Sequence, residues 1–311
     1  MIISKRKRIQ DESMNHHALI VGGLGFLGSS LCQSLKRRGW KVTCASRHAG
    51  QTVDGMYMDI TDYPSICDAL EQSAADTLIN LASYGVQYHE KDAEAMADIN
   101  ATGPRLLAKA AVDSGQIKRF FHAGSCFEYG HHSGLITETS EVRPTASYGF
   151  YKSKGTEAIL TELSGRVPHM VGRLFSLWGE HEAAGRFMST IFNAARNGRE
   201  VALTGCDQLR DYIHVADAAE LIATLLAHCH FGQDPLVNIA SGDHRSLRDY
   251  AIAINNEMGN TATLNFGAVP YRDSEMMSLL CDNTLLMKYC SQDNIKTFEE
   301  HIRNWKNNSQ Y

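Results

Sequence analysis

The sequence predicts an α/β protein built on a doubly wound parallel sheet, with a smaller C-terminal substrate-binding lobe. Near the start of the chain, the apolar run 18–21 is followed directly by a glycine-rich turn and then by helical spacing of apolar residues over 29–38. Further along, short apolar runs alternate with helical segments. Strands that alternate with helices are typical of a parallel sheet with helices on both faces.

Length and composition agree with this fold class. The 311 residues are enough to bury a sizeable core, and 43% hydrophobic with 21% charged residues is typical of a globular protein. The formal net charge of -5 favours no nucleic-acid partner. No apolar run approaches the roughly 20 residues of a membrane span, so we expect no membrane partner. The eight cysteines are scattered without a C-x-x-C pair, which favours core thiols in a cytoplasmic protein and no metal site.

The chain divides into three predicted parts. Residues 1–13 carry a short basic run without the apolar segment of a secretory signal, and we expect a disordered leader. Residues 14–179 are expected to form mainly the dinucleotide-binding domain. Residues 180–311 are expected to form mainly the substrate-binding lobe, with 211–241 returning to the first domain.

The glycine-rich turn is the first candidate binding site. Gly22 permits a tight turn, Gly25 lets the backbone approach a pyrophosphate, and Gly28 lets the helix pack against the strand. The helix N-terminus that follows offers free N–H groups and a partial positive charge. We therefore expect Gly22, Gly25, Phe26 and Leu27 to bind a dinucleotide.

The second predicted strand, 41–45, ends in Ser46 and Arg47. An acidic residue about 20 positions after the glycines would bind the ribose hydroxyls of NAD, and this chain has none there. A hydroxyl and a guanidinium suit a 2′-phosphate instead, which favours NADP, with NAD as the alternative. The other interpretation of Arg47 is a solvated loop residue.

Three further strands are predicted before the middle of the chain. Asp59 ends the strand 56–60, where it is placed to meet an adenine amino group or to cap the helix that begins near Pro64. The strand 76–83 ends in small residues against which a flat ring can lie. The strand 119–125 ends at Ser125.

A long helix over 93–112 is expected to contain Asn100 and to be interrupted at 102–104. A later helix opens with Tyr148, and Lys152 lies four residues on, so both side chains lie on one helix face. A free tyrosine has a pKa near 10. A lysine charge and a cationic nicotinamide nearby would lower that pKa and suit Tyr148 to proton transfer.

Together these residues resemble the extended short-chain dehydrogenase/reductase family, and more narrowly its nucleotide-sugar epimerase, dehydratase and reductase branch. The resemblance covers nearly the whole chain after Met14 and implies a Rossmann-type fold, a nucleotide-sugar partner and a homodimer. Ser125, Tyr148 and Lys152 fall on the catalytic triad of the family. By resemblance, Ser125 and Tyr148 bind the reacting oxygen, and Lys152 holds the nicotinamide ribose. The cofactor contacts implied along the first domain are Asp59, Ile60, Leu81, Ala82, Ser83 and Asn100.

The resemblance also implies substrate contacts. Arg210 matches the first diphosphate-binding arginine of the family, and Arg272 the second. Ser176 stands where the family usually has asparagine, so its contact with the diphosphate departs from the pattern. His214 and Asp217 are expected to hold a loop and cap the next helix rather than act in catalysis.

The residues after Ser125 distinguish the branches of the family. A dehydratase has an acid and a base at the positions of Cys126 and Phe127, neither of which performs that proton transfer. Glu128 lies one residue after these two positions, where the family usually has an apolar residue. The sequence therefore argues against a dehydratase.

Two enzymatic functions remain. The Ser46–Arg47 pair favours NADPH-dependent reduction of a nucleotide-linked 4-keto-6-deoxy sugar, with Tyr148 as the proton donor. The alternative is a nucleotide-sugar epimerase that retains its cofactor. A non-catalytic dinucleotide sensor is disfavoured because the triad is intact. Residues 185–188 are expected to enter the sugar pocket, without indicating which sugar or base is bound.

Overall fold

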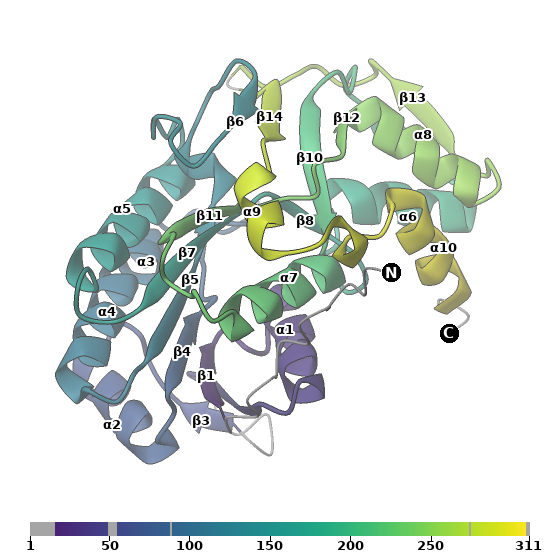
Figure 1. Ribbon diagram of the computed structural model, residues 1–311. Coiled ribbons are helices and arrows are strands. Elements are labelled where there is room, and N and C mark those ends of the chain that lie inside the picture. The colour runs from purple at the N-terminus through teal and green to yellow at the C-terminus, as the bar shows by residue number, and fades with distance from the viewer. Residues whose placement is uncertain (1–15, 49–54, 88, 274, 309–311) are drawn as a thin grey trace, which may run out of the picture.

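The structure is a computed structural model that describes residues 16–48, 55–87, 89–273 and 275–308 (Figure 1). The predicted leader 1–13 lies outside the described residues. Seven parallel strands form the larger sheet, in the order β11–β7–β5–β4–β1–β2–β3. Their bounds are β1 His17–Val21, β2 Lys41–Ser46, β3 Gly55–Tyr57, β4 Thr77–Asn80, β5 Arg119–Ser125, β7 His169–Leu174 and β11 Leu236–Ile239. The predicted doubly wound α/β fold is confirmed.

Helices cover both faces of this sheet (Figure 1). One face packs on α1 and α7, and the other on α2, α4 and α5, through two separate apolar cores. These helices are α1 Phe26–Arg37, α2 Tyr63–Ser73, α4 Gly103–Ser114, α5 Ser147–Glu162 and α7 Val215–Ala227. Short helical elements connect or flank them: α3 Ala93–Ala97, the π-helical η2 Asp98–Thr102 and the 3₁₀ turn η3 Cys126–Glu128.

The strand order reverses between β1 and β4, which are adjacent in the sheet although β2 and β3 lie between them in sequence. Ligands of open α/β sheets bind at such a reversal, beyond the carboxyl ends of the strands. The glycine-rich turn after β1 and the residues after β4 and β5 meet at this edge. The topology therefore gathers the predicted site at one end of the sheet.

A smaller lobe lies over this edge, in the upper part of Figure 1. Its main sheet has the order β12–β10–β14–β6, with β8 also paired to β10, and β13 pairs β9 separately. Trp178, Phe192, Tyr250 and Phe298 are buried in its apolar core. The strands are β6 Leu135–Ile136, β8 Ser176–Trp178, β9 Glu200–Leu203, β10 Leu209–His214, β12 His244–Ser246, β13 Thr263–Phe266 and β14 Ser278–Cys281. The remaining helices are α6 Phe187–Asn197, α8 Leu247–Glu257, α9 Thr284–Tyr289, η4 Gln292–Asn294 and α10 Phe298–Asn308.

Several element bounds differ from those predicted. The strand expected over 169–176 divides into β7 and β8, which belong to different sheets. The strand expected over 56–60 is β3, which ends at Tyr57, so Asp59 lies in the connection to α2. The helix expected over 93–112, with an interruption at 102–104, is formed by α3, the π-helical turn η2 and α4 in direct succession, and Pro104 lies in the first turn of α4. Within the predicted return segment 211–241, α7 and β11 pack in the larger layer, whereas β10 lies in the smaller sheet.

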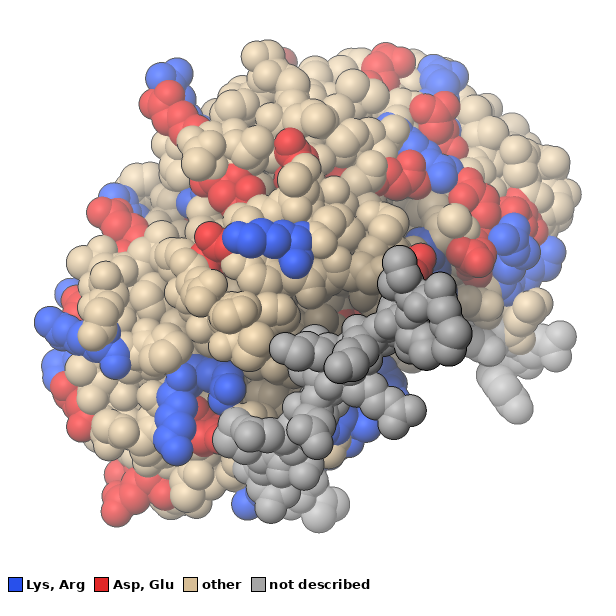
Figure 2. All heavy atoms as spheres, in the orientation of Figure 1, with Lys and Arg blue, Asp and Glu red and all other residues tan. Residues whose placement is uncertain are grey.

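Acidic and basic side chains are interspersed over the face of the molecule in Figure 2. Among the described residues, no helix is long and apolar enough to cross a membrane.

Candidate active site

The glycine-rich turn forms a tight cradle at the start of α1. Gly22 has a φ of +78°, which favours glycine. A Cβ at Gly28 would lie 2.2 Å from the Gly22 carbonyl oxygen, so the helix packs against the turn only with glycine there. Gly25 is the N-cap of α1, which begins at Phe26, three residues before the predicted start. The first N–H groups of a helix have no partner within the helix, and at the start of α1 these include the N–H groups of Phe26 and Leu27.

The end of β2 and the segment after β3 lie side by side. Arg47 is exposed, and the Ser46 hydroxyl accepts a hydrogen bond from the His48 N–H at 3.1 Å. Burial opposes ionisation of Asp59, but hydrogen bonds from Thr61 and the charge of Arg47 hold the pKa of its carboxyl below the ordinary value. Asp59 and Arg47 are thus brought together at the rim of the dinucleotide edge.

The alternative role of Asp59 as a helix cap is wrong. The N-cap of α2 is Asp62, and the Asp59 carboxylate accepts hydrogen bonds from the N–H and hydroxyl of Thr61 at 2.9 and 2.7 Å. Ile60 is buried in the core beside Gly103, where a Cβ would lie 2.8 Å from the Ile60 Cδ1 atom. The close packing of Ile60 against α4 positions Asp59 at the surface.

The residues after β4 are held by Asn100, which is fully buried in the π-helical turn. The Leu81 N–H donates to the Val21 carbonyl at 2.9 Å, so the chain continues alongside β1. The Asn100 side-chain oxygen accepts from the Ser83 hydroxyl at 3.3 Å and the Tyr84 N–H at 3.1 Å, and its amide donates to the Tyr84 carbonyl at 2.6 Å. π-Helical turns occur often at functional sites. Asn100 therefore sets the course of the loop that carries Ser83.

Ser125, Tyr148 and Lys152 converge where β5 ends and α5 begins. The Ser125 hydroxyl accepts from the Phe127 N–H at 3.2 Å, and it acts to lower the pKa of the Tyr148 phenol. The Tyr148 phenol lies 3.3 Å from the Ser83 hydroxyl. Lys152 is 1% exposed, and its Nζ donates to the Ala123 carbonyl at 2.5 Å. The structure thus brings the three predicted catalytic side chains together.

Burial dominates the electrostatics of Tyr148 and Lys152. Burial raises the pKa of the Tyr148 phenol to about 12, against the opposing hydrogen bonds from Ser83 and Ser125. Burial also lowers the pKa of Lys152 to about 8, although the charge of Glu128 acts in the other direction. Desolvation is the largest influence on the pKa of both groups, and it acts against the charged form of each.

Glu128 does not face the site. Its carboxylate is 0% exposed and accepts hydrogen bonds from the Ser125 N–H at 2.8 Å, the Thr156 hydroxyl at 3.0 Å and the Arg173 Nε at 2.8 Å. A carboxylate with these partners has no position from which to serve as the acid or base of a dehydratase. Sequence reasoning missed Arg173 and Thr156, although an arginine inside the apolar run 169–174 was a signal for a buried acidic partner.

The predicted substrate-binding residues are spread over the smaller lobe. Arg210 is buried in β10, and its guanidinium donates to the carbonyls of Leu209 at 2.9 Å and Met276 at 2.5 Å. Its charge acts on the thiol of Cys126, which follows Ser125 in the chain. Ser176 is the register partner of Tyr212 on β10. The structure therefore brings Arg210 and Ser176 into one sheet, through the pairing of β8 with β10.

Arg272 lies on the exposed loop between β13 and β14. The neighbouring Tyr271 connects this loop to the segment between β9 and β10, because its hydroxyl donates to the Asp207 carboxylate at 2.7 Å and accepts from the Asp207 N–H at 3.1 Å. Ser274, in the same predicted motif, lies outside the described residues. Arg210 is held in a sheet, whereas Arg272 is carried by a surface loop.

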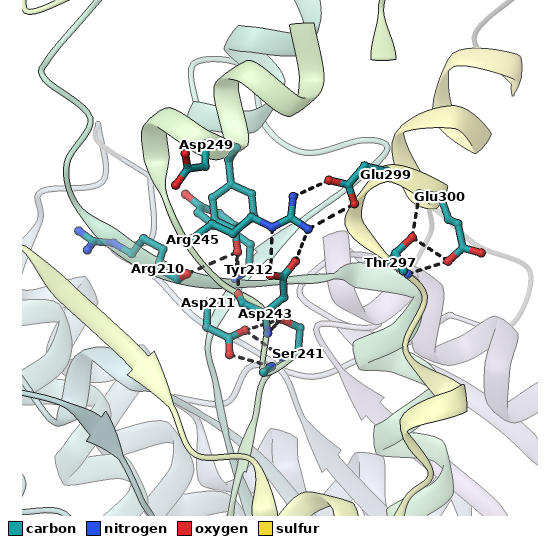
Figure 3. A network of polar contacts seen from close by, with 12 residues as sticks. Arg210, Asp211, Tyr212, Ser241, Asp243, Arg245, Asp249, Thr297, Glu299 and Glu300 are labelled. Atoms are coloured by element: carbon teal, nitrogen blue, oxygen red, sulfur yellow. Dashed lines mark hydrogen bonds and ion pairs between the residues drawn. The ribbon is translucent and has the colours of Figure 1, made fainter. Parts of the chain in front are cut away.

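A polar network connects β10 to its neighbours, and the Arg210 carbonyl belongs to it as the acceptor of the Tyr250 hydroxyl (Figure 3). Asp211 accepts from the N–H and hydroxyl of Ser241 at 2.9 and 2.8 Å and from the Gly242 N–H at 2.9 Å. In the same network Arg245 forms ion pairs with Asp243 and Glu299. These contacts connect β10 to β12 and α10.

His214 and Asp217 have the structural roles expected of them. His214 is the N-cap of α7, with its Nδ1 accepting from the Ala216 N–H at 3.2 Å. Asp217 accepts from the His301 ring at 2.7 Å and from the Lys296 N–H at 3.0 Å. Both residues line a cavity of about 480 Å³ behind β10, and none of the triad residues lines it. His214 and Asp217 therefore anchor the C-terminal segment.

Comparisons with known proteins agree with this geometry. A sequence model described as the NAD dependent epimerase/dehydratase family matches residues 18–240. The chain is 27% identical over 305 residues to UDP-glucose 4-epimerase of Neisseria meningitidis serogroup C, covering 85% of this chain and 88% of that protein. It is 23% identical over 288 residues to CDP-abequose synthase of Salmonella muenchen, covering 88% and 92%.

Among solved structures, UDP-glucose 4-epimerase of Thermus thermophilus in complex with NAD has a TM-score of 0.81 at 19% identity, over 95% of this chain and 100% of that one. That similarity is one of fold, and it agrees with the doubly wound sheet described above. The match to residues 18–240 shows that this chain belongs to the NAD dependent epimerase/dehydratase family and is an enzyme of the extended short-chain dehydrogenase/reductase type.

Proposed function

We propose that this enzyme reduces the keto group of a nucleotide-linked 4-keto-6-deoxy sugar and takes its reducing equivalents from NADPH. The observation that carries the proposal is the end of β2, where Ser46 and the exposed Arg47 stand in place of an acidic residue. A guanidinium binds phosphate oxygens in a bidentate manner, whereas a carboxylate would repel a 2′-phosphate.

The described residues fit a dinucleotide along the carboxyl edge of the sheet. The cradle of Gly22, Gly25 and Gly28 would hold the pyrophosphate, and Arg47 the adenosine end. Lys152 would hold the nicotinamide ribose through the Nζ protons that it does not donate to Ala123. When bound, a reduced nicotinamide supplies the hydride that the ketone carbon receives.

The chain's own residues supply the proton and bind the reacting oxygen. Tyr148 donates its phenolic proton to the carbonyl oxygen of the sugar, which becomes the product hydroxyl. Ser125 donates a hydrogen bond to the same oxygen as negative charge develops, a contribution of about 3 kcal/mol if it equals that of other oxyanion donors. A phenol with a raised pKa stays protonated at neutral pH, as a proton donor must.

The residues after Ser125 favour this reaction over dehydration. Cys126 is buried, with its thiol pKa raised to about 12, and Phe127 has no ionisable group. The Glu128 carboxylate is occupied by Ser125, Thr156 and Arg173. A site that transfers a proton at Tyr148 and no second proton suits simple reduction.

A nucleotide-sugar epimerase is the second candidate, because relatives named as epimerases match most of the chain. An epimerase regenerates its cofactor in each turnover, whereas a reductase releases it oxidised. Calorimetric titration of the purified protein with NADPH and NADH, after assay for cofactor retained through purification, separates the two functions. Tight NADPH binding with weak NADH binding supports the reductase, and retained NAD would overturn it in favour of the epimerase.

A further inference from the structure

The buried carboxylate of Glu128 joins three elements beneath the triad. Its Oε1 accepts from the backbone N–H of Ser125 at the end of β5 and from the hydroxyl of Thr156 on α5. Its Oε2 accepts from the Arg173 Nε on β7. Ser125 stands on β5, and Tyr148 and Lys152 stand on α5. One carboxylate therefore connects the two elements whose separation decides how the triad meets a substrate.

The backbone around Glu128 is adapted to this contact. A Cβ at Gly124 would lie 2.8 Å from the Glu128 Oε1 atom, so glycine leaves room for the carboxylate. A Cβ at Gly149, next to Tyr148, would lie 2.2 Å from the Phe127 carbonyl oxygen. The turn η3 and the first turn of α5 thus pack backbone to backbone, and Glu128 holds the same two elements one turn beyond Lys152.

Arg173, the ion-pair partner of Glu128, is itself held in place by Tyr129. The Arg173 guanidinium lies 4.4 Å above the ring of Tyr129, whose hydroxyl donates to the Asn238 side-chain oxygen at 2.7 Å. Burial of an ion pair adds little net stability, since desolvation cancels most of the attraction. A buried pair that also binds the backbone of a catalytic residue acts instead by fixing the position of that residue.

We propose that Glu128 is a positioning residue, which holds Ser125 on β5 in register with Tyr148 and Lys152 on α5 through Thr156 and is itself held by Arg173. This inference rests on the proposed function of the triad.

The charge of Glu128 also reaches the reacting groups. Next to the larger effect of burial, it raises the pKa of Tyr148 and that of Lys152. The other groups that face Tyr148 are the hydroxyls of Ser83 and Ser125 and the thiol of Cys126. Loss of the Glu128 charge should therefore lower the pKa of the phenol.

The test places 3-fluorotyrosine at position 148 of the full chain, loaded with NADP⁺, and follows its ¹⁹F resonance against pH. The fluorine lowers the pKa of the phenol and brings its titration into a range where the fold persists. We expect Glu128→Gln to lower the titration midpoint by roughly half a pH unit or more. Glu157→Gln, the same change at an exposed position of α5, should leave the midpoint unchanged.

Two further variants separate position from charge and from folding. Glu128→Gln/Arg173→Met removes both buried charges, keeps an acceptor for Ser125 and Thr156, and should show a midpoint between those of wild type and Glu128→Gln in a folded protein, because the Arg173 charge is lost as well. Thr156→Val keeps the charge and removes one donor, and we expect it to displace the ¹⁹F resonance by more than its linewidth, whereas Thr161→Val on the exposed face of α5 does not.

Folded Glu128 variants with an unchanged midpoint, together with an unmoved resonance in Thr156→Val, would overturn the positioning role. The ¹⁹F measurement needs no sugar substrate. A protein that shows these shifts and reduces no nucleotide-linked keto sugar would contradict the proposed reduction and leave the positioning role supported.

Discussion

Gly155 of α5 packs directly against the backbone of Asn100 in the π-helical turn: a Cβ at Gly155 would lie 2.2 Å from the Asn100 carbonyl oxygen. The helix that carries Tyr148 and Lys152 and the turn that holds Ser83 are therefore in van der Waals contact at a position where any side chain would separate them. This contact fixes the position of α5 relative to η2 on one side of the site. On the other side, the Glu128 carboxylate connects α5 to the end of β5.

The first prediction concerns that contact. Gly155→Ala should lower the free energy of unfolding by about 1–3 kcal/mol, because overpacking exceeds the gain of roughly 1 kcal/mol in helix propensity. Denaturant unfolding measures the change. Ser153→Ala, at a half-buried position of the same helix where the hydroxyl bonds the Phe150 carbonyl, is the control and should be near neutral. A stabilised Gly155→Ala protein would mean that α5 moves freely relative to Asn100.

The second prediction concerns the proton donor. Tyr148→Phe should abolish turnover of a nucleotide-linked 4-keto-6-deoxy sugar, because the phenolic proton is lost, while calorimetry shows cofactor binding largely intact. Tyr151→Phe, three residues on in α5, should retain turnover. Near-normal activity of Tyr148→Phe would remove Tyr148 from the site.

The third prediction concerns cofactor choice. Arg47→Ala should weaken NADPH binding roughly 10- to 100-fold, since a charge-assisted hydrogen bond contributes about 1.5–3 kcal/mol, and should change NADH binding little. Isothermal titration with both cofactors measures this. Arg38→Ala, at a remote ion pair with Glu220, is the matched control. Equal losses for NADPH and NADH would show that Arg47 does not recognise the 2′-phosphate.

The fourth prediction concerns pH and stability in the cofactor-free protein. Burial lowers the pKa of Lys152 to about 8, below the value near 10.4 expected in the unfolded chain. Between these values the unfolded state binds the extra proton, so stability rises with pH across the window, by about 3 kcal/mol in total. Below pH 8 Lys152 is protonated in both the folded and the unfolded state, so the free energy of unfolding carries the full cost of the buried charge.

Unfolding of wild type, Lys152→Met and the exposed control Lys154→Met at pH 7 to 10 isolates this contribution. The difference between wild type and Lys152→Met should change with pH in the stated direction, and Lys154→Met should follow wild type. A constant difference between wild type and Lys152→Met would show that Lys152 keeps an ordinary pKa.

The sequence alone determined the architecture and the order of its reactive groups. Strand and helix alternation depends on local periodicity, and the turn after β1 depends on glycines at fixed spacing, so both can be predicted from neighbours in the chain. The same holds for β5, which the structure bounds as predicted, and for Tyr148 and Lys152 on one face of α5, since their spacing sets their direction.

The tertiary structure decided what surrounds each of these groups. Glu128 and Arg173 are 45 residues apart, and only the pairing of β5 with β7 makes one the partner of the other. The strand predicted over 169–176 ends as β7 at Leu174, because Ser176 pairs with Tyr212 on β10 in the second sheet. The pKa values of Tyr148 and Lys152 followed from burial rather than from their spacing. Desolvation and long-range contacts are properties of the folded molecule, and local sequence pattern does not carry them.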